Sequence, residues 1–219
     1  MTIIVKIGGS LTRDAAPRRL LARLAAEGGL VVVPGGGALA DQVRAVQPQW
    51  DLSDAAAHRM ALLSMEQMAH AMRDLEPRLL PARDRAELAA AVARGAALWF
   101  PAAMTLGRPD IAESWDVTSD SLALWLAAEM GAERLVLVKA PGTRIPAPLP
   151  APSGGRAADI AAWTAMGLVD AAFATMAVRF TGDILAIPAD DGDRLDAALR
   201  AKGRAAAINE ETKEGSRLS

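Results

Sequence analysis

A single lysine inside an apolar run is the first feature of this sequence that could do chemistry. The run "IIVKIGGSL" spans residues 3–11 and carries Lys6 just before its glycines. The small residues that follow are Gly8, Gly9 and Ser10. A buried ammonium group is costly unless it is paired or hydrated, but a lysine stem can lie along a sheet while its charge reaches the turn. There the charge could neutralise phosphate oxygens; the alternative is a lysine that reaches solvent from an edge strand.

A second glycine cluster follows the apolar run "LVVVP". It consists of Gly35, Gly36 and Gly37. Glycine lets backbone N–H groups approach an anion closely, and a following helix adds the positive end of its dipole. Either cluster could cradle a phosphate, although a plain tight turn is the alternative for each. The spacing matches neither a P-loop nor G-x-G-x-x-G, because Leu39 and Ala40 stand where the third glycine would fall.

The stretch "WDVTSDSLALWLA" combines hydroxyl and carboxylate groups at the start of an expected helix. Thr118 or Ser119 could cap this helix, which leaves Asp120 in its first turn. An aspartate in that position stabilises any helix, so capping is the alternative to a chemical role. The carboxylate could also orient Lys6 toward a phosphoryl group.

Two further side chains are candidates for contact with a bound molecule. His58 and Arg59 lie on a long expected helix, and Arg59 could pair with a phosphate. The alternative is that both lie on a solvated or interface-facing side of the helix. Trp115 could line the same site, although an aromatic side chain more often packs in a core.

Short β-rich runs alternate with alanine-rich amphipathic segments along the chain. Strands are predicted at residues 2–7, 30–34, 97–101, 134–139, 177–180 and 183–187. Helices are predicted at residues 14–29, 38–46, 53–75, 84–95, 118–131, 157–165, 170–176 and 191–203. Strands that are apolar throughout are typical of parallel strands covered by helices on both faces. The sequence therefore predicts an α/β protein, a three-layer α/β/α sandwich with a mainly parallel central sheet.

Composition excludes several classes of site and partner. The 219 residues suit one large domain or two small lobes, and the formal net charge of −2 gives no reason to expect nucleic acid or an anionic membrane. The sequence has no cysteine, which excludes disulfides, thiolate chemistry and cysteine-based zinc sites. The first residues lack the basic leader of a signal peptide, and no apolar stretch has the length of a membrane span. A cytoplasmic protein is the expectation.

Three stretches in this order resemble the amino acid kinase superfamily: "VKIGGSL", "VVVPGGG" and "TSDSLALWLAAEMGAERLVLVK". The resemblance covers residues 2–142. Within the superfamily, "LSDAAAHRMALLSMEQMAHAM" and "SWDVTSDSLALWLA" are most similar to the small kinases of methanofuran biosynthesis. It implies an ATP- and Mg²⁺-dependent kinase that acts on a small phosphorylated acceptor, converting [5-(aminomethyl)furan-3-yl]methyl phosphate to its diphosphate.

The resemblance also implies roles for individual residues. Lys6 would contact the transferring phosphate, and Asp120 would organise the catalytic lysines. The first glycine turn would bind phosphate, and the second turn would bind the acceptor. Apart from the resemblance, Ser119 is a candidate for phosphate binding and Arg59 for acceptor binding. Lys139 and Gly142 would face the nucleotide, and no residue is assigned to a metal.

Departures from the family pattern keep other functions open. A threonine and an aspartate are usual in uridylate kinases around positions where Val138 and Pro141 stand here. Acetylglutamate kinases bring a second lysine from a later helix, but "GLVDAAFATMAVRF" has none, and Arg179 could replace it only if the geometry allows. A kinase for uridylate or a carboxylate, or a non-catalytic nucleotide-binding storage or regulatory protein, is therefore an alternative. A dinucleotide oxidoreductase is disfavoured, because its glycine spacing is absent and Pro34 stands where an acidic residue should end the second strand.

The resemblance further implies the organisation of the chain. Residues 1–219 would form a single amino acid kinase-like domain, with an acceptor lobe at about 1–115, a nucleotide lobe at about 116–205 and a polar tail at 206–219. A homo-oligomer is expected, assembled through the long helix at 53–75. The role of the proline-rich loop at 141–155 stays open.

Overall fold

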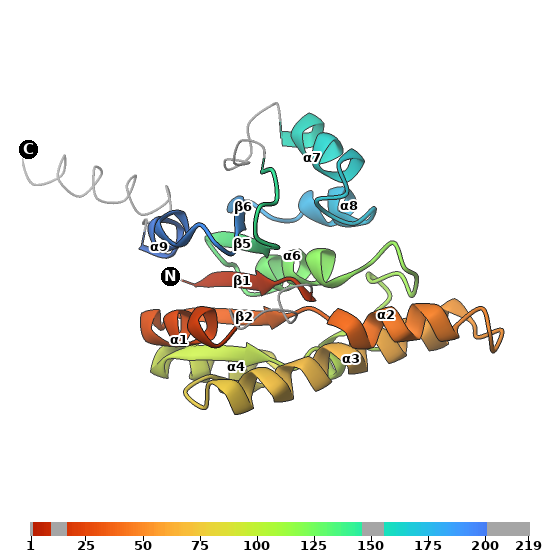
Figure 1. The fold of residues 1–219 in the computed structure, drawn as a ribbon, viewed down its shortest axis with the longest axis horizontal. Helices are drawn as coiled ribbons and strands as arrows, with labels where there is room; N and C mark the ends of the chain where they lie inside the picture. Colours follow the sequence, from red (N-terminus) through yellow and green to blue (C-terminus); the bar gives the residue numbers. More distant parts are fainter. Residues whose placement is uncertain (1, 10–16, 146–155, 201–219) are drawn as a thin grey trace, which may run out of the picture.

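A six-stranded, all-parallel sheet forms the centre of the protein (Figure 1). The computed structural model describes residues 2–9, 17–145 and 156–200. The strand order is β3-β4-β2-β1-β5-β6. The strands are β1 (Ile3–Ile7), β2 (Leu30–Pro34), β3 (Leu80–Ala82), β4 (Ala96–Trp99), β5 (Arg134–Lys139) and β6 (Asp183–Pro188). Because β1 lies between β2 and β5, the ends of these three strands meet at one edge of the sheet.

Helices cover both faces of the sheet. In the described part of the chain they are α1 (Pro17–Glu27), α2 (Gly37–Val46), α3 (Asp54–Leu75), α4 (Arg85–Arg94), α5 (Ala102–Thr105), α6 (Ser119–Glu129), α7 (Arg156–Ala165), α8 (Phe173–Ala177) and α9 (Gly192–Arg200). Alternate residues of each strand feed two separate cores: Ile4 packs with side chains of α4, α6 and α8, whereas Val5 packs with those of α1 and α9. The predicted three-layer α/β/α sandwich is confirmed.

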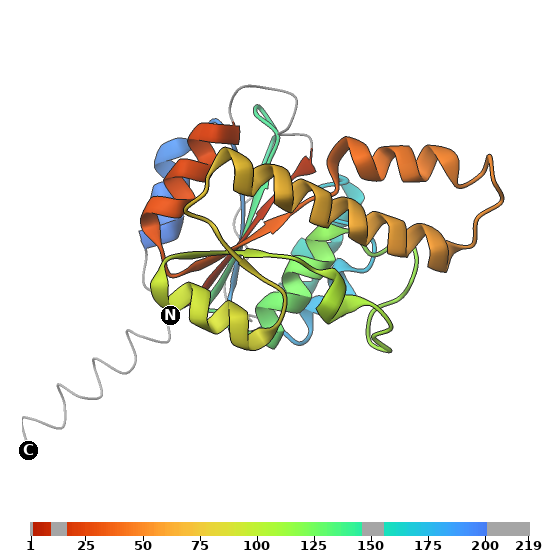
Figure 2. The same cartoon turned by 90° about the horizontal axis from the view of Figure 1, so that it is seen from below.

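The long helix and its partner project beyond the sheet. Ser53 caps α3 by accepting a hydrogen bond from the Ala56 N–H, and the helix ends at Leu75, two residues before Pro77. Figure 2 shows α2 and the first half of α3 lying side by side past the carboxyl edge of the sheet. This projection forms one wall above the strand ends.

Three segments differ from the sequence prediction, one of them the four-residue helix α5, which was not predicted. Residues 177–180 are not a strand: Ala177 ends α8, and Ala177 and Phe180 are buried while Val178 is exposed. That three-residue spacing is one helical turn rather than the alternation of a strand. The short edge strand β3 was not predicted, because Pro81 at its centre is tolerated only at a sheet edge or bulge.

No helix in the described ranges is both long enough and apolar enough to cross a membrane. The predicted tail at 206–219 and most of the proline-rich loop lie outside the described residues.

Candidate active site

The two glycine turns touch each other through their backbones. The β1 and β2 ends are in register, with Ile7 opposite Pro34, and the Gly35 N–H donates to the Ile7 carbonyl oxygen at 2.9 Å. A Cβ atom added to Gly9 would lie 2.3 Å from both the Cα and the N of Gly37. Only glycine permits this approach, and Gly37 also has a φ of +55°. The turns therefore form one continuous surface of bare main chain.

Three charged side chains meet beside this surface. Lys6 Nζ lies 2.9 Å from Asp120 Oδ1, and Lys139 Nζ lies 3.0 Å from each oxygen of the same carboxylate. Lys6 comes from the centre of the sheet, Lys139 ends the neighbouring strand β5, and Asp120 stands in the first turn of α6. Lys6 and Asp120 are only 5% and 7% exposed, so solvent screens the cluster weakly. We call these three residues the lysine–aspartate cluster.

The cluster carries more positive than negative charge. Burial alone would raise the pKa of Asp120, but the charges and hydrogen bonds of Lys6 and Lys139 outweigh it and lower that pKa. Burial, together with the charge of Lys6, lowers the pKa of Lys139, and Asp120 opposes this shift. Two ammonium groups share this one carboxylate, whereas Asp170, whose charge also acts on Lys139, accepts its hydrogen bonds from Thr118 and Ser121. Such a site favours an anionic group as an additional ligand.

A second carboxylate fixes the start of α6. Asp170 accepts hydrogen bonds from the Thr118 N–H and hydroxyl at 3.0 and 2.6 Å, from the Ser121 N–H at 3.0 Å, and from the Ser121 hydroxyl. Burial raises the pKa of Asp170, which its hydrogen bonds oppose. Asp170 thereby positions the turn that carries Asp120. Sequence reasoning missed this residue, since nothing in the pattern links Asp170 to a helix start about fifty residues earlier.

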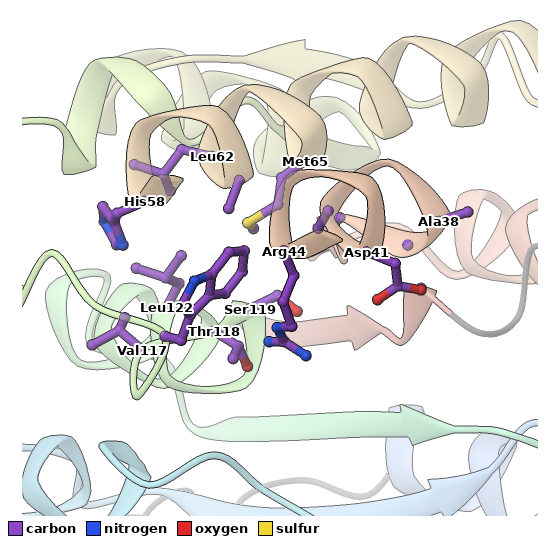
Figure 3. A pocket seen from close by; sticks show the side chains of 16 residues that line it. Ala38, Asp41, Arg44, His58, Leu62, Met65, Val117, Thr118, Ser119 and Leu122 are labelled. Atoms are coloured by element: carbon purple, nitrogen blue, oxygen red, sulfur yellow. The ribbon is translucent and has the colours of Figure 1, made fainter. Parts of the chain in front are cut away.

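A cavity of about 260 Å³ opens next to the glycine turns. Gly9, Gly36 and Gly37 line it, and so do Thr118 and Ser119 at the start of α6. Figure 3 shows side chains of α3 on one wall and the segment at 117–122 on the opposite wall. The cavity therefore joins the bare main chain to the helix that carries Asp120.

Arginine and tryptophan side chains from two segments line the cavity and contact each other. The Arg44 guanidinium lies 4.5 Å from the centre of the Trp115 ring, a cation–π contact. The Trp115 N–H donates to the Gln47 side-chain oxygen, and Gln47 in turn donates to Asp54 at 2.8 Å. These contacts attach the loop before α6 to the α2–α3 projection. Trp115 lines the cavity, as the sequence analysis considered.

In the described ranges, no group of three or more acidic, histidine or cysteine side chains could hold a metal ion. The Asp120 carboxylate is instead committed to two lysines. This donor set fits an anion, and a Mg²⁺ ion that arrives on nucleotide phosphates would need few protein ligands.

Residues 1–140 match the Amino acid kinase family. The chain belongs to this family. Over 140 residues it is 32% identical to the [5-(aminomethyl)furan-3-yl]methyl phosphate kinase of Methanocaldococcus jannaschii, a match that covers 61% of this chain and 63% of that protein. The chain thus matches less than two thirds of the length of this curated relative.

Solved structures share the amino acid kinase fold at low identity. The uridylate kinase of Archaeoglobus fulgidus superposes with a TM-score of 0.64 at 15% identity, covering 93% of this chain and 97% of that one. The UMP kinase of Ureaplasma parvum gives a TM-score of 0.64 at 14% identity, covering 93% and 96%. The aspartate kinase of Synechocystis gives 0.59 at 14% identity, covering 88% of this chain and 38% of that one. At these identities the likeness concerns the fold alone.

The structure brings most of the predicted residues of this amino acid kinase family member together. Lys6, Asp120 and both glycine turns meet at one edge, and Ser119 lines the cavity. Ser10 lies outside the described residues. Gly142 lies in the turn after β5. Its N–H donates to the Asp190 side chain, after β6, at 3.3 Å, and its φ is +71°.

Three basic residues lie elsewhere than the sequence suggested. Arg59 is mostly exposed, lies 3.7 Å from Glu113 and does not line the cavity, whereas Arg44 does. Arg179 pairs with Asp110 at 3.1 Å instead of joining Asp120, so it does not replace a second lysine. Lys139 was expected only to face the nucleotide, but it is the second lysine that pairs with Asp120.

Proposed function

We propose that this protein is an ATP-dependent kinase that transfers a phosphoryl group to a small phosphate monoester. One observation carries the proposal: the buried Lys6 and the largely buried Lys139 share one carboxylate beside two touching glycine turns. Phosphoryl transfer requires in-line placement and neutralisation of charge on the transferred group, and the cluster supplies both cations within a fixed frame.

In this mechanism an oxygen of the acceptor's phosphate attacks the γ-phosphorus of ATP. The bond between that phosphorus and the β–γ bridging oxygen breaks, ADP leaves with the electron pair, and a diphosphate forms on the acceptor. Lys6 and Lys139 hold the non-bridging oxygens of the transferred group, and Asp120 keeps both ammonium groups in place. A phosphate monoester is already ionised near neutral pH, so no side chain needs to remove a proton.

Main-chain groups position the two reactants. The first turn, with Gly8 and Gly9, faces the transferred group, and the second turn holds the acceptor's phosphate. The segment from Lys139 to Gly142 faces the nucleotide. Mg²⁺ bound to ATP supplies further charge neutralisation when present.

We propose [5-(aminomethyl)furan-3-yl]methyl phosphate as the acceptor and its diphosphate as the product. The relative with that activity supports this choice, and so does a cavity that offers Trp115 for an aromatic ring and Arg44 near the glycines for an anion. The alternatives are a uridylate or carboxylate acceptor, or a non-catalytic nucleotide-binding protein. The non-catalytic alternative was favoured by the lack of a second lysine on a later helix. Lys139, at the end of β5, pairs with Asp120 instead.

The test measures ATP consumption with a panel of four acceptors: the aminomethylfuran phosphate, uridylate, N-acetylglutamate and aspartate. We expect turnover with the first and a product heavier by one phosphoryl group in mass spectrometry. Turnover on another acceptor alone would replace the proposed substrate, and ATP binding without turnover on any acceptor would favour the non-catalytic alternative.

We also propose the two-lobe organisation and a homo-oligomer. The exposed apolar side chains Leu39 on α2 and Leu63 on α3 support self-association through the projection. Sedimentation of the full chain would test the assembly.

Replacing Gly9 by alanine should separate the two glycine turns. The new Cβ would lie 2.3 Å from backbone atoms of Gly37, which cannot rotate away as a side chain could. We expect a loss of kcat/KM of at least about 10-fold with the best acceptor of the panel, equivalent to about 1.4 kcal/mol. Gly95→Ala is the matched control, because its Cβ would meet only Leu80 Cδ1, at 4.0 Å. Unchanged kcat/KM in Gly9→Ala would show that the close approach of the turns is not needed.

A further inference from the structure

One carboxylate in the wall of the cavity has no partner of its own. Asp41 lies on α2, is exposed and lines the cavity. Its side chain forms no hydrogen bond or ion pair with any described residue. Of the described residues that line the cavity, it is also the one acid. Its negative charge therefore faces whatever the cavity binds.

The helix itself does not explain a carboxylate at this position. Because α2 begins at Gly37, Asp41 is its fifth residue and lies beyond the first turn, which holds no acidic residue. The favourable interaction of a carboxylate with the helix dipole falls off after the first turn. Arg44, one turn further on, stacks on Trp115 instead of pairing with Asp41. Asp41 therefore contributes little to the stability of α2.

Most other polar side chains of the wall are already engaged. The Trp115 N–H donates to Gln47, and the Thr118 hydroxyl donates at 2.6 Å to the carboxylate that fixes the start of α6. His58 lines the cavity, but its Nε2 is buried and has no partner among the described residues, so it offers little to a bound molecule. A bound molecule that extends beyond its phosphate therefore meets Asp41 as an accessible, charged hydrogen-bond acceptor.

The position of Asp41 relative to the glycine turns defines where a cation would lie. Gly37, Asp41 and Arg44 share one face of α2 at the spacing of successive helical turns, and all three line the cavity. Figure 3 shows the Asp41 and Arg44 side chains pointing from α2 to the side on which Ser119 lies. Since a helix rises about 1.5 Å per residue, Asp41 stands about 6 Å along the axis from Gly37. An acceptor whose phosphate lies on the glycine turns would place a group of that reach beside Asp41.

A negative charge at this distance favours an acceptor that also carries a positive charge. Two like charges about 6 Å apart repel each other even in water, and more strongly near a protein surface. Asp41 therefore weakens the binding of an acceptor whose only charge is its phosphate. An ammonium group would pair with the carboxylate, whereas a neutral hydroxyl would gain only a weaker hydrogen bond.

We infer that Asp41 is a specificity-determining residue that pairs with an ammonium group on the acceptor, about one helical turn from the acceptor's phosphate. The inference rests on the proposed function for the placement of that phosphate. It deepens the proposal by naming the substrate class, which is small phosphate monoesters that bear a primary amine. The same carboxylate selects against purely anionic acceptors, uridylate among them.

The experiment compares two acceptors in the wild type and two variants. The acceptors are [5-(aminomethyl)furan-3-yl]methyl phosphate and its 5-(hydroxymethyl) analogue, in which a neutral hydroxyl replaces the ammonium. Asp41→Asn removes the charge and keeps the shape of the side chain. Asp74→Asn is the matched control, because Asp74 is also an exposed carboxylate on a helix, α3, and does not line the cavity. Both kcat/KM and the Kd from calorimetry are measured for each pair, at low and at high salt.

We expect the wild type and Asp74→Asn to prefer the amine by about 5- to 30-fold at low salt, between an exposed ion pair and a hydrogen bond to a charged group. Asp41→Asn should reduce the preference to within about 2-fold, because only a neutral acceptor is left. Turnover of the hydroxymethyl analogue should rise slightly in Asp41→Asn, because the repulsion of its phosphate is removed. High salt should weaken the preference of the wild type and leave Asp41→Asn unchanged.

A preference for the amine that survives in Asp41→Asn, or that is absent from a wild type that turns over both compounds, overturns the inference and leaves the proposed function intact. An equal loss of preference in Asp74→Asn also overturns the inference, because the charge in the cavity would then not be the cause. Preferential, Asp41-dependent binding of the amine without transfer supports the inference while the proposed function fails. Binding of neither compound overturns both.

Discussion

Lys6→Met should lower kcat by about 10²–10³-fold, the range seen when one preorganised donor to a developing oxyanion is removed. Methionine keeps the length of the side chain and suits the apolar strand around it. The carboxylate of Asp120 retains Lys139 at 3.0 Å, so the variant leaves no buried acid unpaired. Steady-state rates with the best acceptor of the panel measure the effect.

The control for this variant is Arg179→Met. Arg179 is a cation near neither lysine, paired with Asp110 on the surface, and its loss should leave kcat within about 2-fold, as expected for an exposed pair. Circular dichroism of both variants checks folding. A folded Lys6→Met protein with near-normal kcat would remove Lys6 from the mechanism.

Asp120→Asn should lower the free energy of unfolding by about 3–5 kcal/mol, the cost of removing one partner from a buried ion pair. Two largely buried ammonium groups would then face each other without their shared carboxylate. Urea denaturation at pH 7 measures the change. Glu129→Gln is the control, because its pair with Arg85, at 3.7 Å, is partly exposed and should contribute less than about 1 kcal/mol.

The pH dependence of stability follows from the lowered pKa values of Asp120 and Lys139. The pKa of Asp120 is lowered in the folded state, so its contribution is present above its unfolded value of 3.8 and is lost as pH falls through the folded pKa. The Asp120→Asn variant should not show this loss of unfolding free energy as the pH falls. Without Asp120 the pKa of Lys139 should fall further, so the deficit of the variant should shrink as pH rises toward 10.5, the ordinary lysine value.

A second substitution separates charge from packing. Adding Lys6→Met to Asp120→Asn removes one of the two facing cations, and we expect it to recover a large part of the lost stability. A double variant no more stable than Asp120→Asn would mean that the carboxylate acts through its hydrogen bonds alone.

Local patterns were enough to predict much of the fold. The long helix was predicted from Ser53 to Leu75, because its cap and the following Pro77 are both readable in sequence. The six-residue run "RLVLVK" was predicted as a strand and forms β5. The prediction failed at 177–180, where a β-branched and an aromatic residue suggested a strand but packing on α6 and α7 makes a helical turn.

The site was predictable only where short motifs carry it. Lys6 and Asp120 were paired in the prediction because a carboxylate at the start of a helix could hold a lysine near a strand end in position, and Lys6 Nζ lies 2.9 Å from Asp120 Oδ1. The second lysine was sought on a helix, but a strand supplies it, since parallel pairing places the end of β5 beside β1. The unpaired nitrogen of His58 depends on tertiary contacts that no local pattern reveals.

In the proposed mechanism Lys6 and Lys139, both held by Asp120, act together on the group being transferred. The most direct test is a single-turnover measurement with γ-³²P-labelled ATP and the best acceptor, by rapid quench, in the wild type, Lys6→Met and Lys139→Met. We expect the rate constant of transfer to fall by at least about 30-fold in each variant, equivalent to about 2 kcal/mol, while the Kd for ATP changes far less. A Lys139→Met protein that transfers phosphate at the wild-type rate would contradict this mechanism.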